Sequence, residues 1–166
     1  MNTTNKPKTQ GFTIIEVVLV LAIAGLIFLI VFLALPALQR SQRDTQRKND
    51  LSRFMSQLTQ YQSNKQGALP GTTATAWGTN FVSVYLTNNG QTFNDPSTGG
   101  TYALAVTSTV PGAGTAPTFA NNPGSMNVYI GAVCNTANAS GVAGGSSRDV
   151  AVLVALEQGG FLCQSN

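Results

Sequence analysis

The feature that most constrains this chain is an unbroken run of 19 apolar residues at positions 17–35. At about 1.5 Å per residue, a helix of this length spans about 28 Å, close to the hydrocarbon thickness of a bilayer. A cleaved secretory signal peptide is the first alternative, but its apolar core is shorter and a small-residue cleavage pattern follows it. Here the run leads through Pro36 and Arg40 into a polar helical pattern. The sequence therefore predicts a membrane helix that is retained.

A short motif lies directly before the apolar run. Residues 11–16 are Gly-Phe-Thr-Ile-Ile-Glu, and a leader that contains Lys6 and Lys8 precedes them. This pattern resembles the processing motif of the type IV pilin (prepilin) family. The resemblance implies that a prepilin peptidase cuts between Gly11 and Phe12 and that the new amine of Phe12 is methylated. A glycine before the cut suits this role, because it lets an extended backbone approach a protease closely.

Glu16 is the only charged residue between Phe12 and Gln39. A carboxylate just inside a membrane helix costs up to a few kcal/mol, so it is a candidate functional residue. The alternative is a glutamate that the helix dipole and interfacial water stabilise at a helix N-terminus. The family resemblance implies a role in assembly, in which Glu16 pairs with the N-terminal amine of a neighbouring subunit. Cleavage after Gly11 would create that amine.

The helical pattern continues beyond the apolar run. Apolar residues recur at steps of three and four, which predicts one buried face of an amphipathic helix: Leu51, Phe54, Met55, Leu58 and Tyr61. Gly67, with Pro70 behind it, is the expected stop. Gly25 and Pro36 are the expected weak points of the helix.

The rest of the chain is expected to form a β-rich head. Four short runs of β-forming residues are bounded by Gly, Pro, Asn or Ser, at 81–86, 102–106, 127–133 and 150–156. The stretches 110–125 and 135–147 lack periodicity and are expected to be loops. One antiparallel sheet covered by the helix gives an α+β fold, and the family resemblance implies the pilin roll.

The 166 residues allow one long element and a small domain. The expected order is a leader, a membrane-spanning or filament-core helix, an amphipathic helix and a β-rich globular head. These parts are assigned to residues 1–11, 12–35, 36–66 and 67–166.

Arg40, Arg43 and Arg47 lie three and four residues apart, close to one helical face. They are interpreted as a solvated face, as a contact with lipid headgroups or a neighbouring subunit, or as a weaker DNA-contacting strip. More basic residues follow the apolar run than precede it, which alone would favour the opposite orientation in the membrane. The processing motif and the cysteines instead favour a head outside the cytoplasm.

The net charge of +3 gives no support for a nucleic-acid-binding head. From Gln66 onward the charged residues are few and slightly acidic in sum: Asp95, Arg148, Asp149 and Glu157. Nucleic-acid binding depends on many basic groups, so this hypothesis survives only for the helix.

Cys134 and Cys163 are the only cysteines. In an exported head, a disulfide between them is the economical interpretation, and two free buried thiols are the alternative. A disulfide would close a loop of about 30 residues and stabilise the fold by about 3 kcal/mol. The pair also resembles the C-terminal disulfide-bounded region of many pilins.

No catalytic constellation is apparent, and the chain is not expected to be an enzyme. It has no histidine, and charged residues make up 9% against about 25% in an average protein. We therefore expect no cofactor and no metal site. The stretch Asn138-Ala139-Ser140 matches a glycosylation sequon, a pattern common by chance.

The resemblance implies a structural subunit of a type IV pilus, an extracellular filament for adhesion, twitching motility or DNA uptake. The expected partners are copies of the chain in a helical filament, other pilins, prepilin peptidase, the inner-membrane assembly machinery and, before assembly, membrane lipid. The chain would be a single-pass membrane protein first and part of an extracellular pilus later. The alternatives are a pseudopilin of a type II secretion or competence machine and a non-polymerising, membrane-anchored surface binding protein. The last alternative predicts that Glu16 is dispensable and that the leader remains attached.

Overall fold

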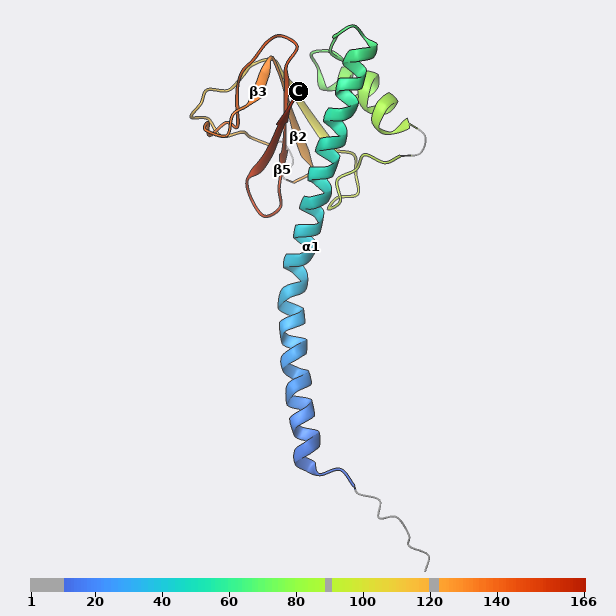
Figure 1. The fold of residues 1–166 in the computed structure, drawn as a ribbon, viewed down its shortest axis with the longest axis vertical. Helices are drawn as coiled ribbons and strands as arrows, with labels where there is room; N and C mark the ends of the chain where they lie inside the picture. The colour runs from blue at the N-terminus through green and yellow to red at the C-terminus, as the bar shows by residue number, and fades with distance from the viewer. Residues whose placement is uncertain (1–10, 89–90, 120–122) are drawn as a thin grey trace, which may run out of the picture. The chain divides into compact units, whose positions relative to one another are not determined.

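The computed structural model describes residues 11–88, 91–119 and 123–166. The leader positions 1–10, with Lys6 and Lys8, lie outside the described residues. The chain divides into two compact units, one that ends at Gln39 and a head unit, Arg40–Asn166. The longest element, α1 (Ile14–Asn64), contributes to both units (Figure 1).

Helix α1 begins at a polar cap. The backbone N–H of Glu16 donates to the hydroxyl of Thr13 at 3.4 Å and to the Thr13 carbonyl at 3.2 Å. Thr13 and Glu16 thus have the spacing of a capping box, in which a hydroxyl and an acidic residue three positions on satisfy the first helical turn. The helix then continues through Pro36 to Asn64.

The predicted apolar face of the amphipathic helix is confirmed. Leu51, Phe54 and Leu58 are fully buried, and Met55 and Tyr61 nearly so. They belong to the main hydrophobic core of the head, together with residues from the sheet. The long N-terminal helix with an apolar first part, packed in its second part on a small sheet, is therefore the α+β fold that the sequence predicts.

The predicted stop, Gly67, lies in the turn directly after α1. Gly67 has a φ of 82°, a conformation that glycine adopts without the steric cost borne by other residues. Its N–H donates to the carbonyl of Gln62 at 2.7 Å, and the N–H of Lys65 donates to Tyr61 at 2.9 Å. These bonds satisfy carbonyls that would otherwise lack partners at the end of the helix.

Four strands of the head form one sheet in the order β1-β2-β5-β6. They are β1 (Ala103–Thr107), β2 (Ser125–Ile130), β5 (Val150–Ala155) and β6 (Phe161–Ser165). Strands β2, β5 and β6 pair antiparallel, whereas β1 pairs parallel to β2. A separate antiparallel pair is made by β3 (Ala132–Cys134) and β4 (Val142–Gly144), and β2, β3 and β5 are labelled in Figure 1.

Strand β5 buries both of its faces. Val150, Val152 and Val154 point into the core that contains the apolar stripe of α1. Ala151 and Leu153 point into a second, smaller core on the opposite face. This alternation follows from the two-residue period of a strand.

One predicted strand is wrong. Residues 81–86 are helical, because they lie in the π-helix η1 (Gly78–Leu86), which follows the short helix α2 (Ala74–Trp77). Thr73 caps α2 by accepting a hydrogen bond from Ala76 N–H. Phe81 and Leu86 are buried in the main core, so helical burial overrides the β propensity of this run.

Three further expectations need correction. The predicted strand at 127–133 is two strands, interrupted at Gly131, where φ is 75°. The sheet is not wholly antiparallel, because β1 runs parallel to β2. The expected loop at 135–147 contains β4, and the last strand, β6, was not predicted.

Candidate functional site

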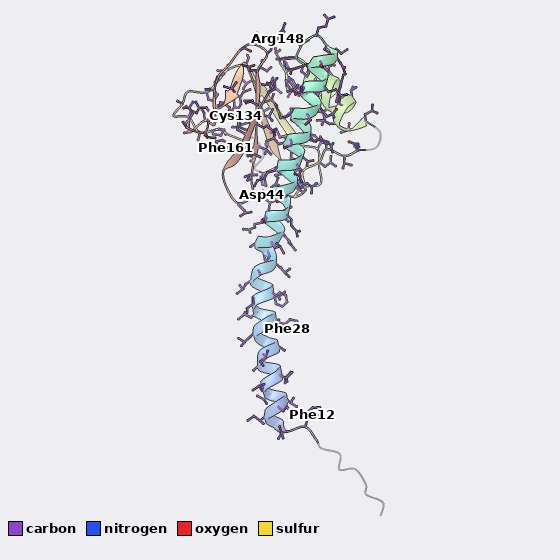
Figure 2. The ribbon with its side chains drawn as sticks, in the orientation of Figure 1. Phe12, Phe28, Asp44, Cys134, Arg148 and Phe161 are labelled. Carbon is purple, nitrogen blue, oxygen red and sulfur yellow. A yellow bond between two sulfur atoms is a disulfide. The ribbon has the colours of Figure 1, made fainter. Side chains whose placement is uncertain are left out.

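The first unit presents an almost wholly exposed apolar helix. Phe12 is 87% exposed, and the large apolar side chains of the following run are exposed as well. Phe12 and Phe28 are marked on this segment in Figure 2. Within the described residues, α1 is the one helix long and apolar enough to cross a membrane. An uncovered apolar surface of this size needs a membrane or a protein partner.

Glu16 lies near the N-terminal end of this apolar surface. It shares a shallow apolar hollow of about 350 Å³ with Phe12, Val17, Val20 and Leu21. Among the described residues, no ion pair involves Glu16. The sequence-predicted processing residue Phe12 and assembly residue Glu16 are thus brought together on one apolar surface.

The three arginines of the basic strip do not form one exposed surface. The side chain of Arg47 is fully buried, that of Arg43 is 30% exposed, and Arg40 is exposed. Arg47 therefore makes its contacts inside the head unit and is not open to lipid, DNA or a neighbouring subunit.

Arg47 binds three carboxylates. Its Nε donates to Asp95 at 2.6 Å, and its Nη1 donates to Asp44 at 2.9 Å. Its Nη2 donates to Glu157 at 3.0 Å. Arg43 makes a bidentate contact to Glu157, with a distance of 2.7 Å to each carboxylate oxygen. Together these residues form an ion cluster of Arg43, Asp44, Arg47, Asp95 and Glu157.

Backbone and hydroxyl groups complete the ion cluster. Asp44 accepts the backbone N–H of Glu157 at 2.8 Å and that of Gln158 at 3.2 Å. Asp95 accepts the backbone N–H and the hydroxyl of Ser97. The cluster therefore fastens α1 to two distant segments, the loop around Asp95 and the turn after β5.

The hydrogen bonds set the ionisation of the carboxylates. Burial alone would raise the pKa of Asp95, but hydrogen bonds from Arg47 and Ser97 lower it to about 2. Burial also acts to raise the pKa of Asp44. Hydrogen bonds from the backbone N–H groups of Glu157 and Gln158 outweigh this effect of burial, so the pKa of Asp44 is lowered. The hydrogen bond from Arg43 lowers the pKa of Glu157. All three groups are ionised at neutral pH.

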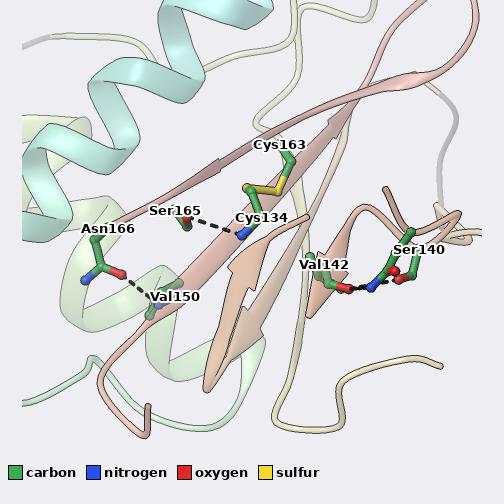
Figure 3. The surroundings of a disulfide bond; sticks show 8 residues. Cys134, Ser140, Val142, Val150, Cys163, Ser165 and Asn166 are labelled. Atoms are coloured by element: carbon green, nitrogen blue, oxygen red, sulfur yellow. Dashed lines mark hydrogen bonds between the residues drawn. A yellow bond between two sulfur atoms is a disulfide. The ribbon is translucent and has the colours of Figure 1, made fainter. Parts of the chain in front are cut away.

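The predicted disulfide is confirmed. Cys134 at the end of β3 is bonded to Cys163 in β6, with their Cα atoms 5.8 Å apart (Figure 3). Beside it, the N–H of Cys134 donates to the hydroxyl of Ser165 at 3.3 Å. The bridge joins the β3–β4 pair to the edge of the main sheet.

The sequon lies in a tightly bonded turn. The side-chain amide of Asn138 and the hydroxyl of buried Ser140 both donate to the carbonyl of Val142, each at 3.0 Å. Both residues thus have a structural role, because they hold the turn that leads into β4.

The ion cluster was not predicted from the sequence. The pair Asp44 and Arg47, three residues apart on one helix, was the signal available. Asp95 and Glu157 gave no such signal, since they lie 48 and 110 positions from Arg47 in the sequence. In the parts of the chain that the structure describes, no group of His, Cys, Asp and Glu side chains is arranged to hold a metal ion.

The comparisons with known proteins bear on the N-terminal segment. Residues 6–32 match the family model described as the prokaryotic N-terminal methylation motif. Searches of curated proteins and of solved structures found no match to the chain. The matched segment contains Gly11, Phe12, Glu16 and most of the apolar run. This chain thus carries the prokaryotic N-terminal methylation motif, the class III signal of type IV pilins and pseudopilins.

Proposed function

We propose that this chain is a structural subunit of a type IV pilus. Prepilin peptidase cuts between Gly11 and Phe12, and the new amine of Phe12 is methylated. The apolar part of α1 lies in the membrane before assembly and in the filament core afterwards, with the head outside the cytoplasm. The observation that carries this proposal is the methylation motif joined directly to the exposed apolar part of α1, residues 14–39, in which Glu16 is the only charged residue.

Glu16 gives the proposal its assembly step. A carboxylate held in apolar surroundings is costly unless a cation pairs with it. Cleavage after Gly11 places an amine on Phe12, and that amine supplies the cation when a second subunit lies alongside. Once a second subunit covers the apolar surface around Glu16 and Phe12, water is excluded from such a pair, which strengthens it.

The proposed partners follow from this assembly. They are copies of the same chain, other pilins, prepilin peptidase, the inner-membrane assembly machinery and, before assembly, membrane lipid. DNA remains a weak candidate, because only Arg40 of the predicted strip is exposed and Arg47 is buried.

The first experiment is intact-mass and N-terminal analysis of the protein in sheared surface material and, separately, in membranes. The proposal predicts a chain that starts at methylated Phe12 in the sheared fraction. A chain that keeps its leader and is found only in membranes would favour a non-polymerising anchored protein. A processed chain that stays in the cell envelope would favour a pseudopilin.

A variant pair tests the role of Glu16. Glu16→Ala should be processed and remain in membranes but be absent from sheared filaments. Ile15→Ala is the matched control, because Ile15 is also exposed in the first turn of α1 but has no charge to lose. If Glu16→Ala assembles as well as the control, Glu16 has no role in assembly.

A further inference from the structure

A second hollow lies within the head unit, between the C-terminal end of α1 and the π-helix η1. Its volume is about 300 Å³, at the lower end of the range for small-molecule sites. The residues that line it combine aromatic, amide, hydroxyl and ammonium groups: Tyr61, Lys65, Thr79, Asn80, Val84 and Tyr85.

The apolar part of this hollow is fixed and open to solvent. The ring of Tyr85 stacks on Phe81 at 5.9 Å and meets the ring of Tyr61 edge-on at 5.3 Å. Val84, beside it, is 51% exposed. An aromatic ring that is fixed by its neighbours, next to an exposed aliphatic side chain, offers a rigid surface on which a flat, partly apolar ligand can lie.

The polar groups are held in place as well. Asn64 donates to the hydroxyl oxygen of Tyr85 at 3.2 Å, so the phenolic O–H remains able to donate. The amide of Asn80 donates to the carbonyl of Pro70 at 3.0 Å, which fixes the orientation of its oxygen. Side chains fixed in this way lose little conformational entropy when a ligand binds.

Lys65 supplies the only charge among the lining residues. It forms no ion pair with any residue in the described part of the chain. Arg148, whose guanidinium lies close to Gly67, does not line the hollow. One unpaired ammonium suits a ligand with one negative group, whereas a nucleic acid needs many phosphate contacts.

The backbone of the hollow is unusual. Four of its lining residues come from the π-helix η1: Thr79, Asn80, Val84 and Tyr85. A π-helix is rare, and π-helical turns are frequent at functional sites. This observation is independent of the side-chain chemistry, and it points to the same place.

We propose that this hollow binds a sugar ring that carries a carboxylate. The C–H face of the ring packs on Tyr85 and Val84, its carboxylate pairs with Lys65, and its hydroxyls bond to Asn80 and the Tyr85 O–H. Sugars present one apolar face and a rim of hydroxyls, which matches an aromatic surface beside amide and hydroxyl groups. The site concerns a single subunit, so the inference does not depend on filament assembly.

The test uses the full-length protein in detergent micelles, with binding to immobilised oligoglucuronate and to a neutral oligoglucose of equal length measured by interferometry. The wild type should prefer the acidic oligomer, and Lys65→Gln should weaken that binding by about three- to fivefold, as expected for one exposed ion pair. Tyr85→Phe should weaken the binding of both oligomers, because it removes one hydroxyl. Lys48→Gln is the matched control, since Lys48 is an exposed lysine of α1 that lies outside the hollow.

Several results would overturn the inference. The wild type could bind both oligomers equally, or neither. Lys65→Gln could bind as the wild type does. An equal loss in Lys48→Gln would indicate non-specific attraction of the polyanion. If double-stranded DNA displaced the acidic oligomer in a manner that required Lys65, the surface would be a nucleic-acid contact instead.

Discussion

The Nε of Arg47 lies 2.6 Å from a carboxylate oxygen of Asp95, and both side chains are fully buried. The two residues are 48 positions apart, so their contact ties α1 to a distant loop. In a low-dielectric interior, each charge depends on the other for its stability. The ion cluster is therefore the part of the head most sensitive to a change of charge.

Removing Arg47 should destabilise the head strongly. Arg47→Met replaces the aliphatic stem of the arginine but removes the guanidinium, which leaves Asp44, Asp95 and Glu157 without their shared cation. Breaking a buried ion pair in this way costs about 3–5 kcal/mol. Urea unfolding of the full-length protein in micelles would measure it, with fluorescence of Trp77, the single buried tryptophan, as the signal.

The control for this prediction is Arg40→Met. Arg40 is exposed and belongs to no ion pair among the described residues, so the free energy of unfolding should change by less than about 0.5 kcal/mol. If the two variants are equally stable, the buried ion cluster makes no net contribution to the stability of the head.

Acid should destabilise the head over a defined range of pH. Asp44, Asp95 and Glu157 have folded-state pKa values below their ordinary values of 3.8, 3.8 and 4.5. A lowered pKa gives stability that is present above the unfolded-state value and is lost as the pH falls through the folded-state value. The loss should run from about pH 4.5 down to about pH 2, the pKa of Asp95.

One group opposes this trend. Burial raises the pKa of Asp50, which accepts a hydrogen bond from Tyr102 at 2.9 Å, so its protonation favours the folded state at low pH. Because three carboxylates have a lowered pKa and one has a raised pKa, we expect a net loss of stability at low pH. Urea unfolding between pH 7 and pH 2 checks the prediction. Asp95→Asn should be less stable at pH 7 but should lose less stability on acidification, and a variant curve parallel to the wild type would contradict it.

Local patterns in the sequence were enough to predict α1, its buried face and its end at Gly67. The 3.6-residue period of Leu51, Phe54 and Leu58 and the freedom of glycine at positive φ are properties of a few neighbouring residues. The same local rules could have corrected the wrong strand. Trp77, Phe81 and Tyr85 recur at steps of four, which is a helical period.

Other features depended on tertiary structure. The parallel pairing of β1 with β2 needs a long connection between them, and the residues of the two strands do not reveal its direction. Arg47 looked like one member of an exposed basic strip, because its partners Asp95 and Glu157 come from distant segments. At the N-terminus the opposite holds, since the roles predicted for Phe12 and Glu16 depend on a local motif alone.

Reducing the disulfide should destabilise the head without unfolding the sheet. Cys134 and Cys163 are 29 positions apart, and a closed loop of this length stabilises a fold by about 3 kcal/mol. Strand β6 still pairs with β5 along its length, so the chain should remain folded in reductant at low urea.

The measurement for this prediction is urea unfolding with and without dithiothreitol, joined to amide hydrogen exchange. The midpoint should fall, and protection should decrease first in β6. The double variant Cys134→Ala, Cys163→Ala is the control, because reductant should have no effect on it. An unchanged midpoint in the wild type would mean that the bridge adds little to the pairing of β6 with β5.

Among the glycines that the structure describes, Gly141 is the one least able to accept a side chain. Its φ is 74°, and a Cβ placed there would overlap the ring of Phe161. An alanine in this left-handed conformation costs about 1–2 kcal/mol, and forcing extra volume into a packed site adds about 1–3 kcal/mol. Gly141→Ala should therefore destabilise the head by about 2–4 kcal/mol in urea unfolding. Gly144→Ala, where a Cβ would meet nothing within 4 Å, should change stability by well under 1 kcal/mol. Equal effects of the two substitutions would show that Phe161 can move aside, and the packing of β6 against the turn before β4 would then be loose.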